Sequence, residues 1–203
     1  MNDFLKGKVN LILNLENNLA IDEFDEFYSV LDKYLENRSK EETFLKNLVE
    51  LRNLLYDFGL SESEVIDAIK LNPSYIHANK VELVVKFYLL GKVVNSENNN
   101  SVRNEIIVRK GKFLRTNYNV IYARIKHLMF LRENFEIFRS ETITARKVFK
   151  LTNEKFETTY GMSRDALLNA YPFTIQTLDE IKNWPENKQI LNDYEEKRNA
   201  RSK

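Results

Sequence analysis

Cysteine is absent from this 203-residue chain, which excludes disulfides, thiolate metal sites and cysteine nucleophiles. Because secreted proteins often depend on disulfides, the absence also favours a reducing, cytoplasmic setting for a soluble protein. Histidine occurs only twice. His77 follows Pro73 in a turn, and His127 has no carboxylate at ligand spacing, so we expect neither a metal nor another cofactor.

Long apolar runs are also missing, and no stretch approaches the eighteen or so apolar residues that a membrane span needs. The first 18 residues contain a short apolar core broken by asparagine, unlike a signal peptide. The glycine-rich phosphate loop, the nucleophile elbow and the H-E-x-x-H zinc motif are all absent. We therefore expect a protein that is not an enzyme and has no membrane partner.

Glycine and proline are scarce, with 5 and 3 residues respectively. Sandwiches and barrels need turn residues about every ten positions, so the scarcity favours helices. Apolar residues make up 43% of the chain and recur at helical spacing. The clearest apolar stripe comprises Phe44, Leu48, Leu51, Leu55 and Phe58. Gly59 is a natural stop for that helix.

The stretch after Gly59 predicts a short helix with defined ends. Ser61 and Glu64 form an S-x-x-E capping box, in which each side chain satisfies a backbone donor at the start of the helix. The predicted helix runs over Glu62–Leu71. Asn72 precedes Pro73 and is disfavoured in helical geometry, so the helix should end there.

Helical patterns cover most of the remaining chain. We predict helices over about 8–20, 22–36, 79–91, 117–138, 142–151, 153–160, 163–170, 173–184 and 186–200, and a short helix or strand over 102–109. The predicted fold class is all-α, with antiparallel helical hairpins stacked as a short, irregular α-solenoid or a helical bundle.

Charge is distributed unevenly although the net charge is only +1. Residues 1–100 hold 11 Lys/Arg and 17 Asp/Glu, residues 101–150 hold 12 and 4, and the remaining 53 residues hold 8 and 9. The Asn-rich stretch 95–101 lies where the sign changes. We therefore predict an acidic helical region over 1–94, a polar linker over 95–101 and a basic-to-neutral helical region over 102–203, which together could form one continuous domain.

The basic segment is the main candidate site. Nucleic acids present regularly spaced phosphates that Lys and Arg neutralise with release of counterions. Arg124, Arg132 and Arg139 fall within about 80° of one another on an ideal helical wheel. The candidate nucleic-acid-binding residues are Arg103, Arg109, Lys110, Lys112, Arg115, Arg124, Lys126, Arg132, Arg139, Arg146, Lys147 and Lys150.

Two alternatives for this charge remain open. The basic segment can be a solvated face paired with the acidic N-terminal region, or it can dock a protein partner. Tyr118 and Tyr122 could stack on bases, although their apolar stripe favours the core. The acidic run over 22–26 alternates with Phe24 and resembles the outer side of an amphipathic helix, where it would suit a basic partner.

Parts of the sequence repeat. Residues 72–90 align without gaps on residues 110–128, pairing Pro73 with Gly111, Asn79 with Asn117 and Lys86 with Arg124. In addition, FGLS over 58–61 recurs as YGMS over 160–163. Each tetrapeptide precedes a short apolar helix and a proline, which indicates a helical repeat.

On these motifs the chain resembles the mitochondrial transcription termination factor (mTERF) family over residues 44–184. The repeat of that family runs from a leucine-rich helix through Gly-Leu-Ser, a short helix and a proline to a longer helix. Residues 50–91 fit one such unit closely. Residues 102–131 fit a unit that lacks Gly-Leu-Ser, and residues 152–184 fit one with a shortened middle helix. The resemblance implies a curved helical stack whose basic concave face binds duplex nucleic acid.

The sequence thus predicts a non-enzymatic helical repeat protein that contacts DNA or RNA phosphates through the basic region 103–150. The alternative function is a helical protein–protein interaction module, such as a regulator or inhibitor from a mobile element, that uses its oppositely charged surfaces. The oligomeric state stays open.

Overall fold

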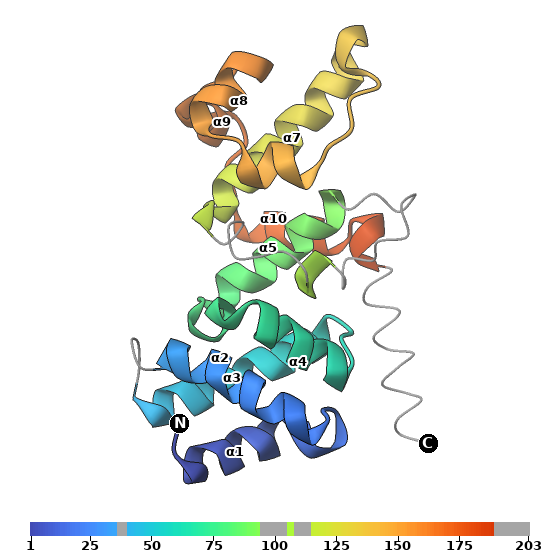
Figure 1. The fold of residues 1–203 in the computed structure, drawn as a ribbon. Coiled ribbons are helices and arrows are strands. Elements are labelled where there is room, and N and C mark those ends of the chain that lie inside the picture. Colours follow the sequence, from blue (N-terminus) through green and yellow to red (C-terminus); the bar gives the residue numbers. More distant parts are fainter. Residues whose placement is uncertain (36–39, 94–104, 108–114, 189–203) are drawn as a thin grey trace. The chain divides into compact units, whose positions relative to one another are not determined.

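A computed structural model describes residues 1–35, 40–93, 105–107 and 115–188 (Figure 1). Within these ranges the chain forms helices and turns without any β-strand, which confirms the all-α prediction. The chain divides into two compact units. Unit 1 comprises residues 1–83, 103–111 and 189–203, and unit 2 comprises residues 84–102 and 112–188. The predicted linker 95–101 lies outside the described residues.

The elements of unit 1 are α1 (Asp3–Leu13), η1 (Leu15–Asn17), α2 (Ile21–Leu35), α3 (Glu41–Asp57), α4 (Glu62–Leu71), η2 (Pro73–His77) and the start of α5 (Lys80–Val93). The division between the units falls inside α5, after Leu83. Those of unit 2 are the rest of α5, α7 (Tyr118–Asn134), η5 (Glu136–Phe138), the π-helical turn η6 (Arg146–Lys150), α8 (Asn153–Tyr160), α9 (Arg164–Ala170) and α10 (Ile175–Lys182).

The core of unit 1 forms around α3. All five residues of the predicted stripe, Phe44, Leu48, Leu51, Leu55 and Phe58, are buried. Helix α3 packs against α1 and α4, and the short η2 contacts α2, α3 and α4. Residues 105–107 are helical, which settles the helix-or-strand alternative for that part of 102–109.

Two buried hydrogen bonds hold segment 105–107 to the rest of unit 1. The side-chain amide of Asn72 donates to the carbonyl oxygen of Ile107 at 2.6 Å, and the hydroxyl of Tyr75 donates to the carbonyl oxygen of Ile106 at 2.9 Å. Because both carbonyls are buried, these donors satisfy groups that would otherwise destabilise the fold.

The turn between α3 and α4 forms as the sequence predicts. Gly59 has φ 80°, a left-handed conformation that disfavours residues with a Cβ atom. The hydroxyl of Ser61 accepts from the Glu64 N–H, and the Glu64 carboxylate accepts from the Ser61 N–H at 2.6 Å, so the capping box is complete. Asn72, before Pro73, leaves the helix at φ −135° and ψ 62°. The predicted helix Glu62–Leu71 is confirmed.

The second glycine–serine motif, in unit 2, shares the positive glycine φ and the serine cap of the first, but its backbone hydrogen bonds differ. The Gly161 N–H donates to the Glu157 carbonyl, four residues back, whereas the Gly59 N–H donates to the Tyr56 carbonyl, three residues back. Gly161 has φ 75°, and Ser163 caps α9 by accepting from the Ala166 N–H. Tyr171, before Pro172, has φ −130° and ψ 67°, close to the values of Asn72. The two stretches therefore share a glycine turn, a serine cap and a pre-proline exit.

Several predicted helices have different bounds in the structure. The helix predicted over 142–151 is reduced to Ala145 and the π-helical turn η6, because residues 141–144 are not helical, and the helix predicted over 173–184 spans 175–182. The first helix occupies residues 3–13 rather than 8–20, because the Asn2 side chain caps its start and Asn14 ends it in a left-handed conformation with φ 53°. Helix α7 ends at Asn134 rather than at 138, because Phe135 adopts an extended conformation. The Asn134 side chain donates to the carbonyl oxygen of Phe130 at 2.8 Å, an additional hydrogen bond in the last turn of the helix.

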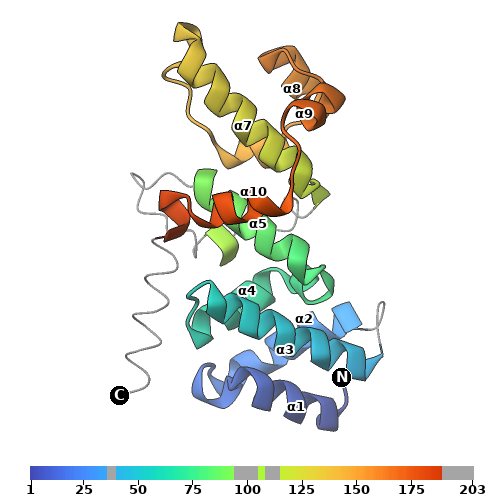
Figure 2. The same ribbon diagram turned by 180° about the vertical axis from the view of Figure 1, so that it is seen from behind.

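Unit 2 is built around α7. Helix α9 packs on α7, and η5 and η6 also contact it. The views from the front and from behind both show α8 and α9 beside α7 (Figures 1 and 2). Glu180 of α10 accepts hydrogen bonds from Tyr122 at 3.2 Å and from Lys126 at 2.9 Å, which attaches α10 to α7.

Candidate nucleic-acid interface

The structure divides the twelve predicted phosphate-contacting residues into three sets. Arg103, Arg109, Lys110 and Lys112 lie outside the described residues. Three others, Arg124, Lys126 and Lys147, are held by groups within unit 2. The remaining five, Arg115, Arg132, Arg139, Arg146 and Lys150, are exposed. Within the described part of the chain, none of these five side chains forms an ion pair.

Arg124 is buried, with only 1% of its surface exposed. Its guanidinium donates to the carbonyl oxygens of Val148 and Leu151 at 3.0 and 2.9 Å, and to the side-chain oxygen of Asn153 at 2.9 Å. It also lies 4.8 Å from the centre of the Phe156 ring, a cation–π distance. Burial lowers the pKa of Arg124 to about 10, which leaves the group charged at neutral pH.

The structure therefore corrects the sequence-based assignment of Arg124. Its donors join α7 to the end of η6 and the start of α8, so it is not available to a phosphate. The cation that aligns with Arg124 in the sequence repeat, Lys86 in α5, is also buried, with 3% of its surface exposed. Each cation lies seven residues after an asparagine, Asn79 or Asn117, whose side chain caps the start of its helix.

Lys126 and Lys147 are also engaged inside unit 2. Lys126 forms an ion pair with Glu180 at 2.9 Å. Burial opposes the charge of Lys126, but the hydrogen bond and charge of Glu180 outweigh it and raise the lysine pKa. Lys147 forms an ion pair with Glu141 and donates to the carbonyl oxygen of Thr142 at 2.7 Å.

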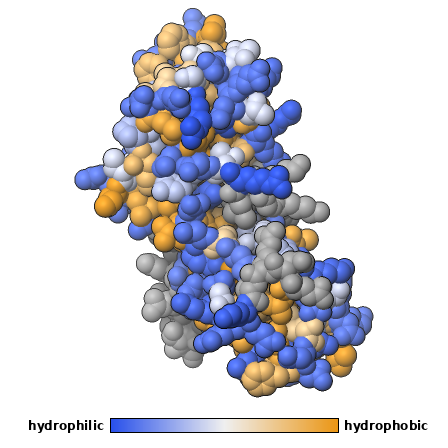
Figure 3. All heavy atoms as spheres, turned by 90° about the vertical axis from the view of Figure 1, so that its left-hand side faces the viewer, coloured by the Kyte–Doolittle hydropathy of each residue, from blue (hydrophilic) through white to orange (hydrophobic). Residues whose placement is uncertain are grey.

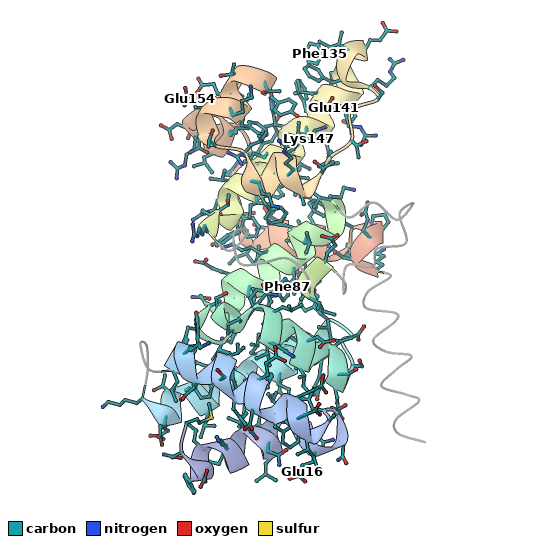
Figure 4. All side chains as sticks on the ribbon, viewed as in Figure 1. Glu16, Phe87, Phe135, Glu141, Lys147 and Glu154 are labelled. Carbon is teal, nitrogen blue, oxygen red and sulfur yellow. The ribbon has the colours of Figure 1, made fainter. Side chains whose placement is uncertain are left out.

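The Glu141 carboxylate joins three segments of unit 2. The hydrogen bond from Lys147 holds the pKa of Glu141 below its usual value of 4.5. The hydroxyl of Tyr160, at the end of α8, donates to the same carboxylate at 3.2 Å. Burial, with the nearby charge of Glu141, raises the pKa of Tyr160 to about 12. Figure 4 shows Glu141 and Lys147 close together beside α7. Glu141 therefore links η6 and the end of α8 through its two side-chain partners, Lys147 and Tyr160.

Three of the exposed cations belong to the region around η6. Thr116 donates its hydroxyl proton to the carbonyl oxygen of Phe149 at 2.8 Å. This bond joins the two chain segments that carry Arg115 and Lys150, the sequence neighbours of Thr116 and Phe149. Arg146 lies one helical turn before Lys150 in η6. We call Arg115, Arg146 and Lys150 the proximal cations.

Arg132 and Arg139 belong to the opposite end of α7. The helix has 17 residues, so its ends are about 25 Å apart. Arg139 follows η5 and is outside the helix. The predicted shared face of Arg124, Arg132 and Arg139 is therefore wrong, because one residue is buried and another has left the helix.

The two tyrosines near the start of α7 pack inward. Tyr118 and Tyr122 both meet Phe173 edge-on, with ring centroids 5.0 and 5.5 Å away. Tyr122 is buried and its hydroxyl bonds to Glu180. Its position favours the core interpretation over base stacking.

Unit 1 carries the opposite charge on α2 and α4. Four acids of α2, Asp22, Glu23, Asp25 and Glu26, are exposed. Burial raises the pKa of Asp67 in α4, Lys70 lowers it, and the charges of Glu23 and Glu64 raise it further. Lys70 pairs with Glu26 at 2.7 Å. The surface where α2 meets α4 is thus predominantly negative.

Sequence reasoning missed an apolar surface at the end of α7. Phe130, Phe135 and Ile137 are exposed, and Figure 4 shows Phe135 at the end of α7 that is far from Tyr118. Hydrophobic residues are visible at the top of Figure 3, the height at which α7 ends in Figure 1. The alternation of Phe135, Glu136 and Ile137 departs from helical spacing and was the available signal.

The described residues contain neither a metal-binding cluster nor a membrane-spanning helix. No group of three or more His, Asp or Glu side chains there is arranged to hold a metal ion. None of the helices described is both long enough and apolar enough to cross a membrane. Comparisons with protein-family models, with curated proteins and with solved structures gave no match.

Proposed function

We propose that unit 2 binds the phosphate backbone of nucleic acid, principally through the proximal cations Arg115, Arg146 and Lys150. The observation that carries the proposal is the division of the basic residues into engaged and exposed sets. Lys126 and Lys147 have carboxylate partners, whereas the proximal cations are exposed and have no acidic partner among the described residues. Exposed, unneutralised cations gathered from two segments suit a polyanion.

The repeated local structure supports a helical-repeat interpretation of this function. Gly59 and Gly161 both have positive φ, and the helix that follows each is capped by a serine side chain. The proposed relationship to the mTERF-like family depends on this repeat. In such a protein, nucleic acid would be held by phosphate contacts rather than by catalytic groups.

The test is the salt dependence of binding to a fluorescent oligonucleotide, measured by anisotropy for duplex and single-stranded forms. Each neutralised phosphate contributes about −0.9 to the slope of log K against log salt on a duplex, or about −0.7 on a single strand. The triple variant Arg115→Gln, Arg146→Gln, Lys150→Gln should weaken binding and reduce the slope by about 2 to 3.

A matched control variant distinguishes the loss of specific phosphate contacts from the effect of a lower net charge on oligonucleotide binding. Lys155→Gln, Lys182→Gln, Lys188→Gln removes the same charge from unit 2 outside the 101–150 segment. It should change the slope by less than one contact, about 0.9. Equal losses in both variants, or no binding by the wild-type chain at low salt, would refute the proposal.

The negative surface of unit 1 favours a second candidate function. Four carboxylates of α2 are exposed beside α4, and the pKa of Asp67 is raised first by burial and then by the charges of Glu23 and Glu64, so a positively charged partner would lower the repulsion among these acids. A helical interaction module of this kind would bind a basic protein segment. Reversing Glu23 and Asp67 to lysine should then abolish partner binding and leave oligonucleotide binding intact.

A further inference from the structure

The surface at the end of α7 combines apolar side chains with charges of both signs. It consists of Phe130, Arg132, Glu133, Phe135, Glu136, Ile137 and Arg139, which we call the distal tip. The exposed fractions of Phe130, Phe135 and Ile137 are 43%, 47% and 81%. The two phenylalanine rings meet edge-on with centroids 6.1 Å apart, so they form one cluster.

The fold of unit 2 leaves this cluster uncovered. Asn134 and Phe135 end α7, and η5 turns the chain so that Ile137 lies outside the apolar stripe of the helix. The contacting pair Phe130 and Phe135 and, two residues further along the chain, Ile137 are all exposed, which is unfavourable in water at about 25 cal/mol for each Å² of apolar surface. Contiguous apolar surface with a polar rim is typical of an association site.

The charges of the distal tip indicate what can cover it. Arg132, Arg139, Glu133 and Glu136 are all exposed, and none of their side chains forms a hydrogen bond or an ion pair with the described residues. With two arginines and two glutamates, the net charge of the distal tip is zero. The two glutamates would repel the phosphates of a nucleic acid, and the two arginines would repel a basic segment.

The distal tip of a second copy of the chain offers partners for charges of both signs. In a two-fold interface the same patch faces itself, so each arginine can meet a glutamate of the partner, and each such pair occurs twice. The apolar side chains would meet at the centre, with the charges at the rim. We propose that the chain self-associates as a two-fold dimer through the distal tip. This proposal is independent of phosphate binding by the proximal cations.

Sedimentation equilibrium of the full chain, freed of nucleic acid, tests the proposal over about 1 µM to 1 mM. We expect a reversible monomer–dimer equilibrium. Ile137→Ser should raise the dissociation constant about tenfold or more, since it removes an exposed apolar side chain from the centre of the interface. Ile175→Ser is the matched control, because Ile175 is 84% exposed at the start of α10, and it should leave the equilibrium unchanged.

Two variants that each carry charges of a single sign in the distal tip give a sharper test of the two-fold arrangement. The variant Arg132→Glu, Arg139→Glu has an all-acidic tip, and the variant Glu133→Lys, Glu136→Lys has an all-basic tip. Each should be monomeric alone, because identical charges would face each other, and an equimolar mixture should form a heterodimer. Circular dichroism of each variant should match the wild type.

Three results would overturn the proposal. The first is a wild-type chain that stays monomeric over the whole concentration range, which would leave the tip to a different partner. The second is self-association by the charge-segregated variants that is as strong as that of the wild type. The third is a mixture of those variants that fails to associate.

Discussion

The turn at Gly59 in unit 1 and the turn at Gly161 in unit 2 share a left-handed glycine and a serine cap but have different surroundings. Both glycines have positive φ, at 80° and 75°. The serine that caps each following helix accepts from the N–H three residues later, on Glu64 or Ala166. A repeated sequence motif therefore reproduces local geometry in two separate units.

The tertiary contacts of the two turns differ. Leu60, after the first glycine, is 2% exposed, whereas Met162 at the same place is half-buried. Phe58 has no polar group, but the equivalent Tyr160 bonds to Glu141. The lesson is that a local motif specifies where the chain turns, while packing decides how much stability the turn contributes.

The largest expected difference is at the residue after the glycine. Leu60→Ala should lower the free energy of unfolding by about 3 kcal/mol, because it empties a fully buried site. Met162→Ala should cost about 1 kcal/mol or less, since its side chain is already partly in water. Urea denaturation followed by circular dichroism measures both. Equal losses would show that the two turns are packed alike.

The glycines themselves should behave similarly. Gly161→Ala should destabilise by about 1 to 2 kcal/mol, the cost of a left-handed conformation for a residue with a Cβ atom. No atom lies within 4 Å of the added Cβ, so strain and not collision causes the loss. Gly59→Ala should lose a comparable amount. Gly161→Asn is the control and should be milder, because asparagine tolerates this conformation. Thermal denaturation would detect the order, and an asparagine variant worse than alanine would contradict it.

The smallest expected effect concerns Tyr160. Tyr160→Phe makes the second turn resemble the first, and should cost about 1 kcal/mol at pH 7 through loss of the bond to Glu141. Because the folded pKa of Tyr160 is raised from 10.0 to about 12, its stabilisation is present below pH 10 and is lost as pH rises toward 12. The stability difference between wild type and variant should therefore shrink above pH 10. A constant difference in urea denaturation between about pH 8 and pH 11 would contradict this assignment.

Local signals predicted the elements that depend on a few adjacent residues. The capping box of Ser61 and Glu64, the stop at Gly59 and the exit before Pro73 all formed as predicted, because each uses backbone groups close in the sequence. Helix α8 over 153–160 was also predicted correctly, between the cap of Thr152 and Gly161. The proposed family relationship and nucleic-acid binding stay predictions.

The candidate site was less predictable, since a charge in the sequence does not reveal its partners. In the sequence, Arg124 and Lys150 are both cations of the basic segment and nothing distinguishes their surroundings. In the structure, Arg124 is buried and donates hydrogen bonds to Val148, Leu151 and Asn153, whereas Lys150 is exposed. Arg139 seemed to extend the face of a helix that in fact ends at Asn134. The burial of Arg124 and the end of α7 at Asn134 both depend on segments that are distant in the sequence.

The sequence by itself determined the all-α class, the two glycine turns and the basic segment, because periodicity, capping and composition act over a few residues. Tertiary structure alone decided which cations face solvent. It buried Arg124 against backbone carbonyls, paired Lys126 and Lys147 with Glu180 and Glu141, and left Phe130, Phe135 and Ile137 uncovered. The physical reason is that exposure and ion pairing depend on what folds against a side chain.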